Sequence, residues 1–252
     1  MESKIIHVVG VQRTGQHAII SWLLGHFDKV AFKNHMSPSN REKWGFAPPF
    51  WYFEPKKRDE WEASEDFREG QDAWILGTEL VGPPVQFNEH MATQMDAYGL
   101  SGTQEIIRII RNPYNHYASV LNWRRNKLLV SPAKFKRAWM AMANAMIDKE
   151  QNPMELCYDI IFDKWFEEEN YRKKITQLLN LKYSDRRLNT VMKIGVGKAW
   201  GSSFDGMTKK NKAQHMHVTE RWKKMLDNEH FQQIYNDPEI ELKANLIGME
   251  KS

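Results

Sequence analysis

The sequence has very little cysteine: Cys157 is the only one among 252 residues. One cysteine cannot form an intrachain disulfide, and it cannot supply a cysteine-based zinc site. Long hydrophobic runs are lacking too, because polar residues from Gln12 to His17 interrupt the longest candidate, residues 5–27. The first residues also lack the basic start of a signal peptide. We therefore expect a cytoplasmic protein with neither a membrane span nor a cleaved leader.

An excess of one charge sign is also missing. The chain has 36 Lys and Arg against 32 Asp and Glu, a net charge of +4. This small excess favours an anionic ligand modestly and gives no argument for nucleic acid. With 41% hydrophobic residues the chain can form a substantial core. We interpret residues 1–252 as a single domain.

Short apolar runs of the kind found in interior strands recur along the chain. They cover residues 5–11, 73–77 and 106–110, with a weaker run at 30–33. Each is followed by a turn and a stretch with an apolar helical face. This alternation predicts an α/β fold, an open and mainly parallel sheet flanked by helices.

The other segments are less regular. Residues 132–149 and 169–181 are predicted as helices, and a final helical region begins after Thr219. Residues 36–72 combine many aromatics with prolines and charges, which suggests an insertion or cap over a site, or else plain packing. Residues 196–214 are rich in Gly, Ser and Lys and are predicted to form a mobile loop.

The first loop lacks half of a familiar phosphate-binding motif. Gly10 and Gly15 have the G-x-x-x-x-G spacing of a Walker A loop, but Gln16 and His17 replace its Lys and its Ser or Thr. Metal-assisted phosphoryl transfer would lose a metal ligand. Backbone N–H groups at a helix N-terminus and the guanidinium of Arg13 remain, and they suit an anion whose transfer needs no divalent metal. A tight turn from strand to helix is the alternative.

A second arginine ends a second predicted strand. Arg111 follows the run at 106–110, and Pro113 fits the first turn of the next helix. Parallel sheets bind ligands at such strand ends. Ser119 lies eight residues after Arg111, so it could share a phosphate with the arginine if the strand end folds over that helix. The alternative is a structural salt bridge for Arg111 and an exposed Ser119.

These two motifs together resemble a known family. Arg-Asn-Pro followed by this serine resembles the 3′-phosphate motif of the sulfotransferases that use 3′-phosphoadenosine 5′-phosphosulfate (PAPS). Arg13-Thr14-Gly15 resembles the loop of that family that binds the 5′-phosphosulfate, and the motifs occur in the family's order. The resemblance implies a P-loop-like architecture, PAPS as the donor and no required metal. The implied donor-binding residues of these motifs are Arg13, Thr14, Gly15, Gln16, His17, Arg111 and Ser119.

Three further stretches fit the resemblance. Glu79 occupies the position of the family's catalytic base, as carboxylates do in some members directed at carbohydrates or proteins. The segment around Tyr158 is similar to one whose tyrosine lies by the adenine. The segment from Gly201 to Phe204, with Arg221-Trp222-Lys223 after it, resembles a C-terminal loop that closes on the nucleotide. The resemblance makes Ser202, Ser203 and Phe204 donor contacts.

The chain also departs from the family pattern. Gln16 and His17 replace two small hydroxyl residues, so an amide and an imidazole would supply those phosphate contacts. Gly77 replaces a lysine beside the base, which puts more of the stabilisation of the sulfuryl group on Arg13 and His17.

The resemblance implies transfer of a sulfuryl group to a hydroxyl or amine of a small-molecule or carbohydrate acceptor. Glu79 would be the base, Arg13 would stabilise the leaving group, and His17 would donate to the sulfuryl or phosphate oxygens. His35 is a second candidate base. The structural alternatives are a surface ion pair for Glu79 and a helix-capping or packing role for His17.

Two rival functions remain open. One is a kinase or NTPase with a P-loop, although the residues after Gly15 count against it. The other is a non-enzymatic protein that binds RNA or another polyanion, suggested by the basic run from Lys209 to Lys212. We expect neither nucleic acid nor membrane as a partner.

Overall fold

The structure is a computed structural model. It describes residues 3–33, 50–53, 61–64, 71–80, 104–122, 131–148, 156–188 and 221–251. Several sequence-based predictions fall outside these residues: those for the 196–214 loop with Ser202, Ser203 and Phe204, for His35, for the Lys209–Lys212 run and for most of the aromatic region.

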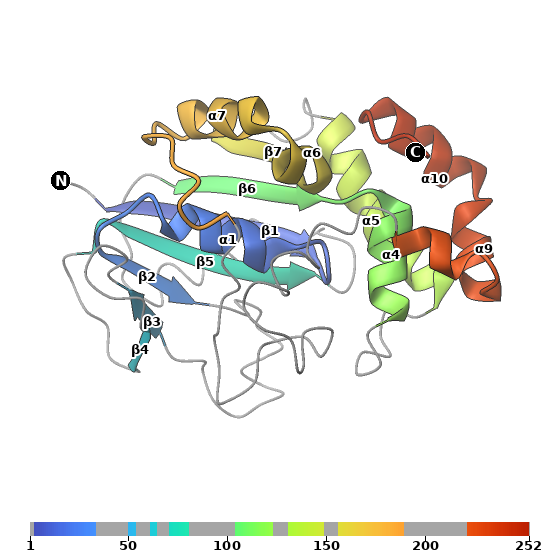
Figure 1. Ribbon diagram of the computed structural model, residues 1–252, viewed down its shortest axis with the longest axis horizontal. Helices are drawn as coiled ribbons and strands as arrows, with labels where there is room; N and C mark the ends of the chain where they lie inside the picture. The colour runs from blue at the N-terminus through green and yellow to red at the C-terminus, as the bar shows by residue number, and fades with distance from the viewer. Residues whose placement is uncertain are drawn as a thin grey trace.

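The strands form one sheet with the order β4-β3-β2-β5-β1-β6-β7 (Figure 1). The five neighbouring strands β2, β5, β1, β6 and β7 are parallel. Strands β3 and β4 are antiparallel and extend the sheet beyond β2. The strands are β1 (Lys4–Val11), β2 (Val30–Lys33), β3 (Phe50–Phe53), β4 (Trp61–Ser64), β5 (Ala73–Leu80), β6 (Gln104–Ile110) and β7 (Cys157–Ile161). The predicted open, mainly parallel sheet is confirmed.

Strand β1 lies in the middle of the sheet and is buried on both sides. Its apolar residues belong to two cores: Ile6 and Val8 face one, Val9 and Val11 the other. A strand covered on both faces needs a nearly continuous apolar sequence, which is the pattern seen here. Gly10 of β1 is in register with Glu79 of β5 and Ile109 of β6. The carboxyl ends of these three strands therefore meet at one edge.

Helices cover both faces of the sheet. One core joins β1 to α1, α6 and α7, and the other joins it to α4, α5, α9 and α10. In Figure 1 the arrowheads of β1, β5 and β6 point toward the side where α4 and α9 lie. The helices are α1 (Gln16–Leu24), α4 (Pro113–Leu121), α5 (Pro132–Ile147), α6 (Phe162–Glu167), α7 (Glu169–Leu178), η3 (Arg221–Met225), α9 (Glu229–Tyr235) and α10 (Pro238–Leu246).

The predicted helices are found with shifted ends. The helix predicted at 132–149 ends at Ile147, and the one at 169–181 ends at Leu178 because Asn180 takes a left-handed φ of 49°. The helical region predicted after Thr219 is a short 3-10 helix, η3, and two further helices that were not predicted, α9 and α10, follow it. None of the helices in the described part of the chain has the length and apolarity needed to cross a membrane.

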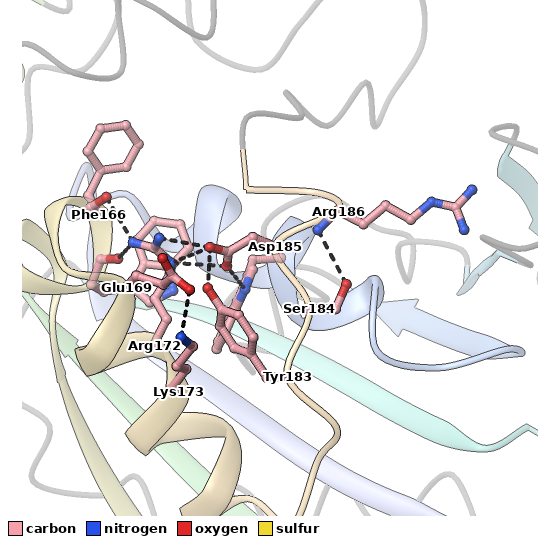
Figure 2. A network of polar contacts seen from close by, with 10 residues as sticks. Phe166, Glu169, Arg172, Lys173, Tyr183, Ser184, Asp185 and Arg186 are labelled. Atoms are coloured by element: carbon pink, nitrogen blue, oxygen red, sulfur yellow. Dashed lines mark hydrogen bonds and ion pairs between the residues drawn. The ribbon is translucent and has the colours of Figure 1, made fainter.

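A polar network fastens the segment after α7 to the rest of the domain (Figure 2). The guanidinium of Arg172 donates through Nη1 to the carbonyls of Trp165 and Phe166, at 2.9 and 3.1 Å, which are free acceptors at the end of α6. Its Nε and Nη2 donate to Asp185 at 2.8–3.0 Å. The Tyr183 hydroxyl also donates to Asp185. The network thus ties α6, α7 and residues 181–188 together.

We expect Asp185→Asn to lower the free energy of unfolding by about 1–2 kcal/mol at neutral pH, because it removes the charge that compensates a buried guanidinium. Burial disfavours the charged carboxylate, but hydrogen bonds from Arg172 and Tyr183 outweigh it and hold the pKa of Asp185 below its ordinary value. A lowered pKa stabilises the fold above the unfolded value, about 4, and this contribution is lost as the pH falls. Urea unfolding of both proteins should therefore converge under acid conditions.

Glu169→Gln is the matched control for this substitution. Glu169 pairs with Lys173 on the exposed side of α7, 2.7 Å apart, and both side chains are about half exposed (58% and 45%). Exposed pairs contribute little to stability. Equal losses in the two variants would contradict the role given to Asp185.

Candidate active site

The loop between β1 and α1 is a tight turn held by the ends of the central strands. The backbone N–H of Gln12 donates to the Leu80 carbonyl at the end of β5, and that of Thr14 donates to Val11, both at 3.1 Å. Arg13 and Gly15 have left-handed φ values of 74° and 94°. The chain then enters α1, whose first N–H groups lack intrahelical acceptors. This arrangement can bind an anion at the helix N-terminus.

Both glycines of the loop are required by close approaches. A Cβ on Gly10 would lie 2.5 Å from Thr14 Oγ1, and one on Gly15 would lie 2.2 Å from Cε2 of Phe162. Thr14 therefore folds back over β1, and Gly15 packs directly against the first residue of α6. These two contacts explain why both ends of the G-x-x-x-x-G motif are glycine.

The side chain of Gln16 points away from the helix terminus. It is buried, and its Nε2 donates to the Val8 carbonyl at 2.8 Å. The amide group is thus used to attach α1 to β1. The backbone N–H of Gln16 remains at the start of the helix.

The second motif is anchored as firmly as the first. Arg111 directly follows β6, and its carbonyl accepts from Trp139 Nε1 of α5 at 2.9 Å. The next N–H, of Asn112, donates to Asp163 Oδ2 at 2.7 Å. The Asn112 side chain accepts from the N–H groups of Tyr114 and Asn115 and caps α4. The prediction that Arg111 lies at the carboxyl end of a strand is confirmed.

The surroundings of Arg111 test the alternative that it forms only a structural salt bridge and that Ser119 is exposed. Its guanidinium lies over the Phe162 ring, 4.9 Å from the centroid, and its Nε is 4.0 Å from Asp163 Oδ1. That distance is too long for a hydrogen bond. Burial lowers the pKa of Arg111, and Asp163 only partly opposes this. Ser119 is on α4 and is buried rather than exposed.

Three arginines from separate segments influence one another here. Burial lowers the pKa of Arg13; Glu79 opposes this and Arg111 adds to it. Burial, together with Arg111 and Arg13, lowers the pKa of Arg221 to about 10. Repulsion between desolvated guanidinium groups is relieved when an anion binds among them. Within the described residues, no cluster of three or more His, Cys, Asp or Glu side chains is arranged to hold a metal ion.

Arg221 is singled out by the structure; the sequence named it only as part of a segment that resembles a nucleotide-closing loop. Its sequence neighbours Lys223 and Lys224 are also basic, and local sequence does not distinguish the three. The difference arises because η3 packs on α4, the helix that follows Arg111. Arg221 is turned inward, while the two lysines are exposed.

Glu79 and His17 come together at the same edge. Glu79 Oε1 lies 3.8 Å from His17 Nδ1, and Oε2 accepts from Gln12 Nε2 at 3.4 Å. Both side chains retain some exposure, 13% for Glu79 and 30% for His17. His17 does not cap α1, because Gly15 holds the N-cap position. The structure thus brings Glu79, His17 and Arg13 into one group.

Tyr158 is not brought to this edge. It pairs with Ile107 near the amino end of the β6–β7 ladder, three residues before Ile161, the last residue of β7. Phe162, the first residue of α6, is the aromatic side chain of this segment that touches the loop and Arg111. A predicted strand ending at Ile161 would have placed Phe162 at the carboxyl edge of the sheet, but the sequence pattern did not predict β7 as a strand.

Comparison with known proteins places the fold. No family model matches the chain, and no curated protein matches it by sequence. Among solved structures, it is similar to the sulfotransferase domain of the Synechococcus PCC 7002 olefin synthase, with a TM-score of 0.59 and 10% identity over 100% of this chain and 96% of that one. It is also similar to the sulfotransferase domain of the curacin biosynthetic pathway, with a TM-score of 0.55 and 12% identity over 98% of both chains.

A mouse sulfotransferase complexed with PAP matches less well, with a TM-score of 0.40 and 15% identity over 73% of this chain, which spans 62% of that chain. The olefin-synthase and curacin-pathway domains carry the conclusion: this chain has the sulfotransferase fold.

We expect Gly15→Ala to destabilise the protein by about 1–3 kcal/mol, because alanine must adopt a left-handed φ and also meets the Phe162 ring. Thermal or urea unfolding measures the loss. Gly25→Ala is the control: Gly25 ends α1 with an ordinary helical φ of −68°, and a Cβ there would come no nearer than 3.1 Å to its closest neighbour, a flexible Arg187 side chain. If the two variants are equally stable, the close packing of Gly15 does not matter.

We expect Arg221→Gln to weaken binding of inorganic pyrophosphate by roughly tenfold, since a partly buried guanidinium forms strong charge-assisted hydrogen bonds to anions. Lys224→Gln removes the same charge from the exposed side of η3 and should change binding by less than about twofold. Titration calorimetry at two salt concentrations compares them. Equal weakening would mean that only the overall charge of the protein matters.

Proposed function

We propose that this protein is a PAPS-dependent sulfotransferase that transfers a sulfuryl group to a hydroxyl or amine of an acceptor. The observation that carries the proposal is the convergence of Arg13, Arg111 and Arg221 at the carboxyl edge of a sheet with the sulfotransferase fold. The donor bears phosphate groups at two separate places, and the site offers two separately anchored arginine loops.

The two loops would divide the donor between them. Arg13, the hydroxyl of Thr14 and the first N–H groups of α1 would bind the 5′-phosphosulfate. Arg111 and Ser119 would bind the 3′-phosphate, and Arg221 would add charge from η3. Since the amide of Gln16 is bonded to Val8, Gln16 would contribute through its backbone N–H. Ser202, Ser203 and Phe204 remain proposed donor contacts.

Glu79 is the proposed base. The acceptor oxygen or nitrogen forms its bond to sulfur as the bond from sulfur to the bridging phosphate oxygen breaks, and the acceptor's proton passes to the Glu79 carboxylate. Arg13 balances the negative charge that grows on the leaving oxygen, and adenosine 3′,5′-bisphosphate departs. His17, 3.8 Å from Glu79, would donate to the sulfuryl oxygens.

The acceptor is proposed to be a small molecule or a carbohydrate. Glu79 and His17 are both partly exposed, so an acceptor can reach them from solvent. A kinase or NTPase with a P-loop is a weaker candidate, because Gln16 and His17 stand where its Lys and its Ser or Thr are needed.

We expect wild-type protein to bind adenosine 3′,5′-bisphosphate without Mg²⁺ and to prefer it to Mg-ATP. Arg111→Ala should abolish that binding because it removes a buried cation from the site. Arg137→Ala, an exposed position on α5, is the control and should bind normally. A preference for Mg-ATP would overturn the proposal in favour of phosphoryl transfer.

Glu79→Gln separates binding from chemistry. The variant should bind the bisphosphate normally and transfer label from PAPS to a screened acceptor roughly 10²- to 10⁴-fold more slowly, which is the usual contribution of a general base. Unchanged transfer by Glu79→Gln would remove Glu79 from the mechanism and direct attention to His35.

A further inference from the structure

His116 is a buried histidine that connects the two arginine loops. It lies on α4, five residues after Arg111, and its ring is fully buried. Its Nε2 is 2.7 Å from the backbone carbonyl of Gln12 in the first loop. Its ring also meets Phe135 of α5 edge to face, with centroids 5.0 Å apart. The helix that begins at the second motif therefore reaches the first.

The chemistry of this contact defines the state of the ring. A carbonyl oxygen can only accept a hydrogen bond, so Nε2 carries the proton and donates. Burial lowers the pKa of His116 to about 3; the bond to Gln12 opposes this change, and Arg111 and Arg13 add to it. The ring is consequently neutral at physiological pH. It supplies a donor to the loop without adding a further positive charge beside the arginines.

The contact holds the peptide group that precedes Arg13. The N–H of Gln12 is bonded to Leu80 and its carbonyl to His116, so the residue is fixed on both sides. Arg13 then adopts a left-handed φ of 74°, a conformation that costs energy for a residue with a side chain. Fixing the preceding peptide restricts the other backbone conformations open to Arg13 and so keeps its side chain in one orientation.

We propose that His116 is a positioning residue: it holds the Arg13 loop in the conformation that binds the phosphosulfate and couples this loop to the Arg111 segment through α4. The identity of the ligand rests on the proposed function. The coupling follows because Arg111, the Asn112 cap and His116 all belong to the same strand end and helix start. A shift of α4 would move both anion-binding groups together.

The matched pair of variants is His116→Gln and His116→Met. The two side chains have similar length and flexibility, but only glutamine can donate to the Gln12 carbonyl. Phe135→Leu is the packing control, because it removes the ring that His116 touches and leaves the hydrogen bond. Melting temperatures identify any variant whose defect is general unfolding.

Affinities for 5′-AMP, 3′-AMP and adenosine 3′,5′-bisphosphate form the first readout. His116→Met should lose about tenfold in affinity for the ligands with a 5′-phosphate and less than about twofold for 3′-AMP, because one hydrogen bond to the first loop is lost. His116→Gln should recover most of the loss. Equal losses for both monophosphates, or equal behaviour of the Gln and Met variants, would overturn the positioning role.

Hydrogen exchange of the unliganded protein is the second readout and does not depend on any nucleotide. Backbone amides of residues 12–17 should exchange about tenfold faster in His116→Met than in His116→Gln, with the amides of α4 unchanged. If wild-type protein binds no nucleotide, the proposed function fails, and exchange still decides the role of His116. Unchanged exchange in the loop, or faster exchange throughout α4, would overturn the inference.

Discussion

The repulsion between guanidinium groups that are buried or partly buried is the constraint around which this edge of the sheet is organised. Desolvation lowers the pKa of Arg13, Arg111 and Arg221. The positive charge of Arg111 lowers the pKa of Arg13 further, and Arg111 and Arg13 together lower that of Arg221. Such groups stay together only if the main chain that carries them cannot relax. The protein meets this requirement in both loops by the same means, with buried side chains that bond directly to the backbone beside each arginine.

Each anchor is a single hydrogen bond between segments that are far apart in the chain. Trp139 holds the carbonyl of Arg111 and Asp163 holds the following N–H, while His116 holds the carbonyl that precedes Arg13. These donors and acceptors come from α5, α6 and α4, so helices from both faces of the sheet meet at the loops. Phe162 completes the arrangement, since the Gly15 turn packs on its ring and Arg111 lies over it. The guanidinium groups are therefore already positioned for an anion, so that binding would require little movement of the protein.

The predicted fold agrees closely with the structure because its signals are local. A central parallel strand must be largely apolar on both faces, so β1, β5 and β6 are visible as mostly apolar runs, with His7 inside β1 and Arg108 inside β6. Strand β7 is only five residues long, lies at the edge of the parallel sheet and contains Asp159, so no continuous apolar run marks it and it was missed. Tyr158 was predicted as a donor contact from the family resemblance, whereas Phe162, four residues later, is revealed as a neighbour of Gly15 and Arg111 only by the fold.

Hydrophobic patterning and the residues that follow each apolar run were sufficient to indicate the sheet and the two arginine loops, since parallel strands end at a common edge. The candidate base Glu79 came from the resemblance to the sulfotransferases. Spatial proximity across long separations came from packing alone. The burial of Arg221, the contact of His116 with Gln12 and the reach of Glu79 to His17 depend on strand register and on how η3 and α4 pack. These relations involve residues far apart in the chain, and no local pattern encodes their distances.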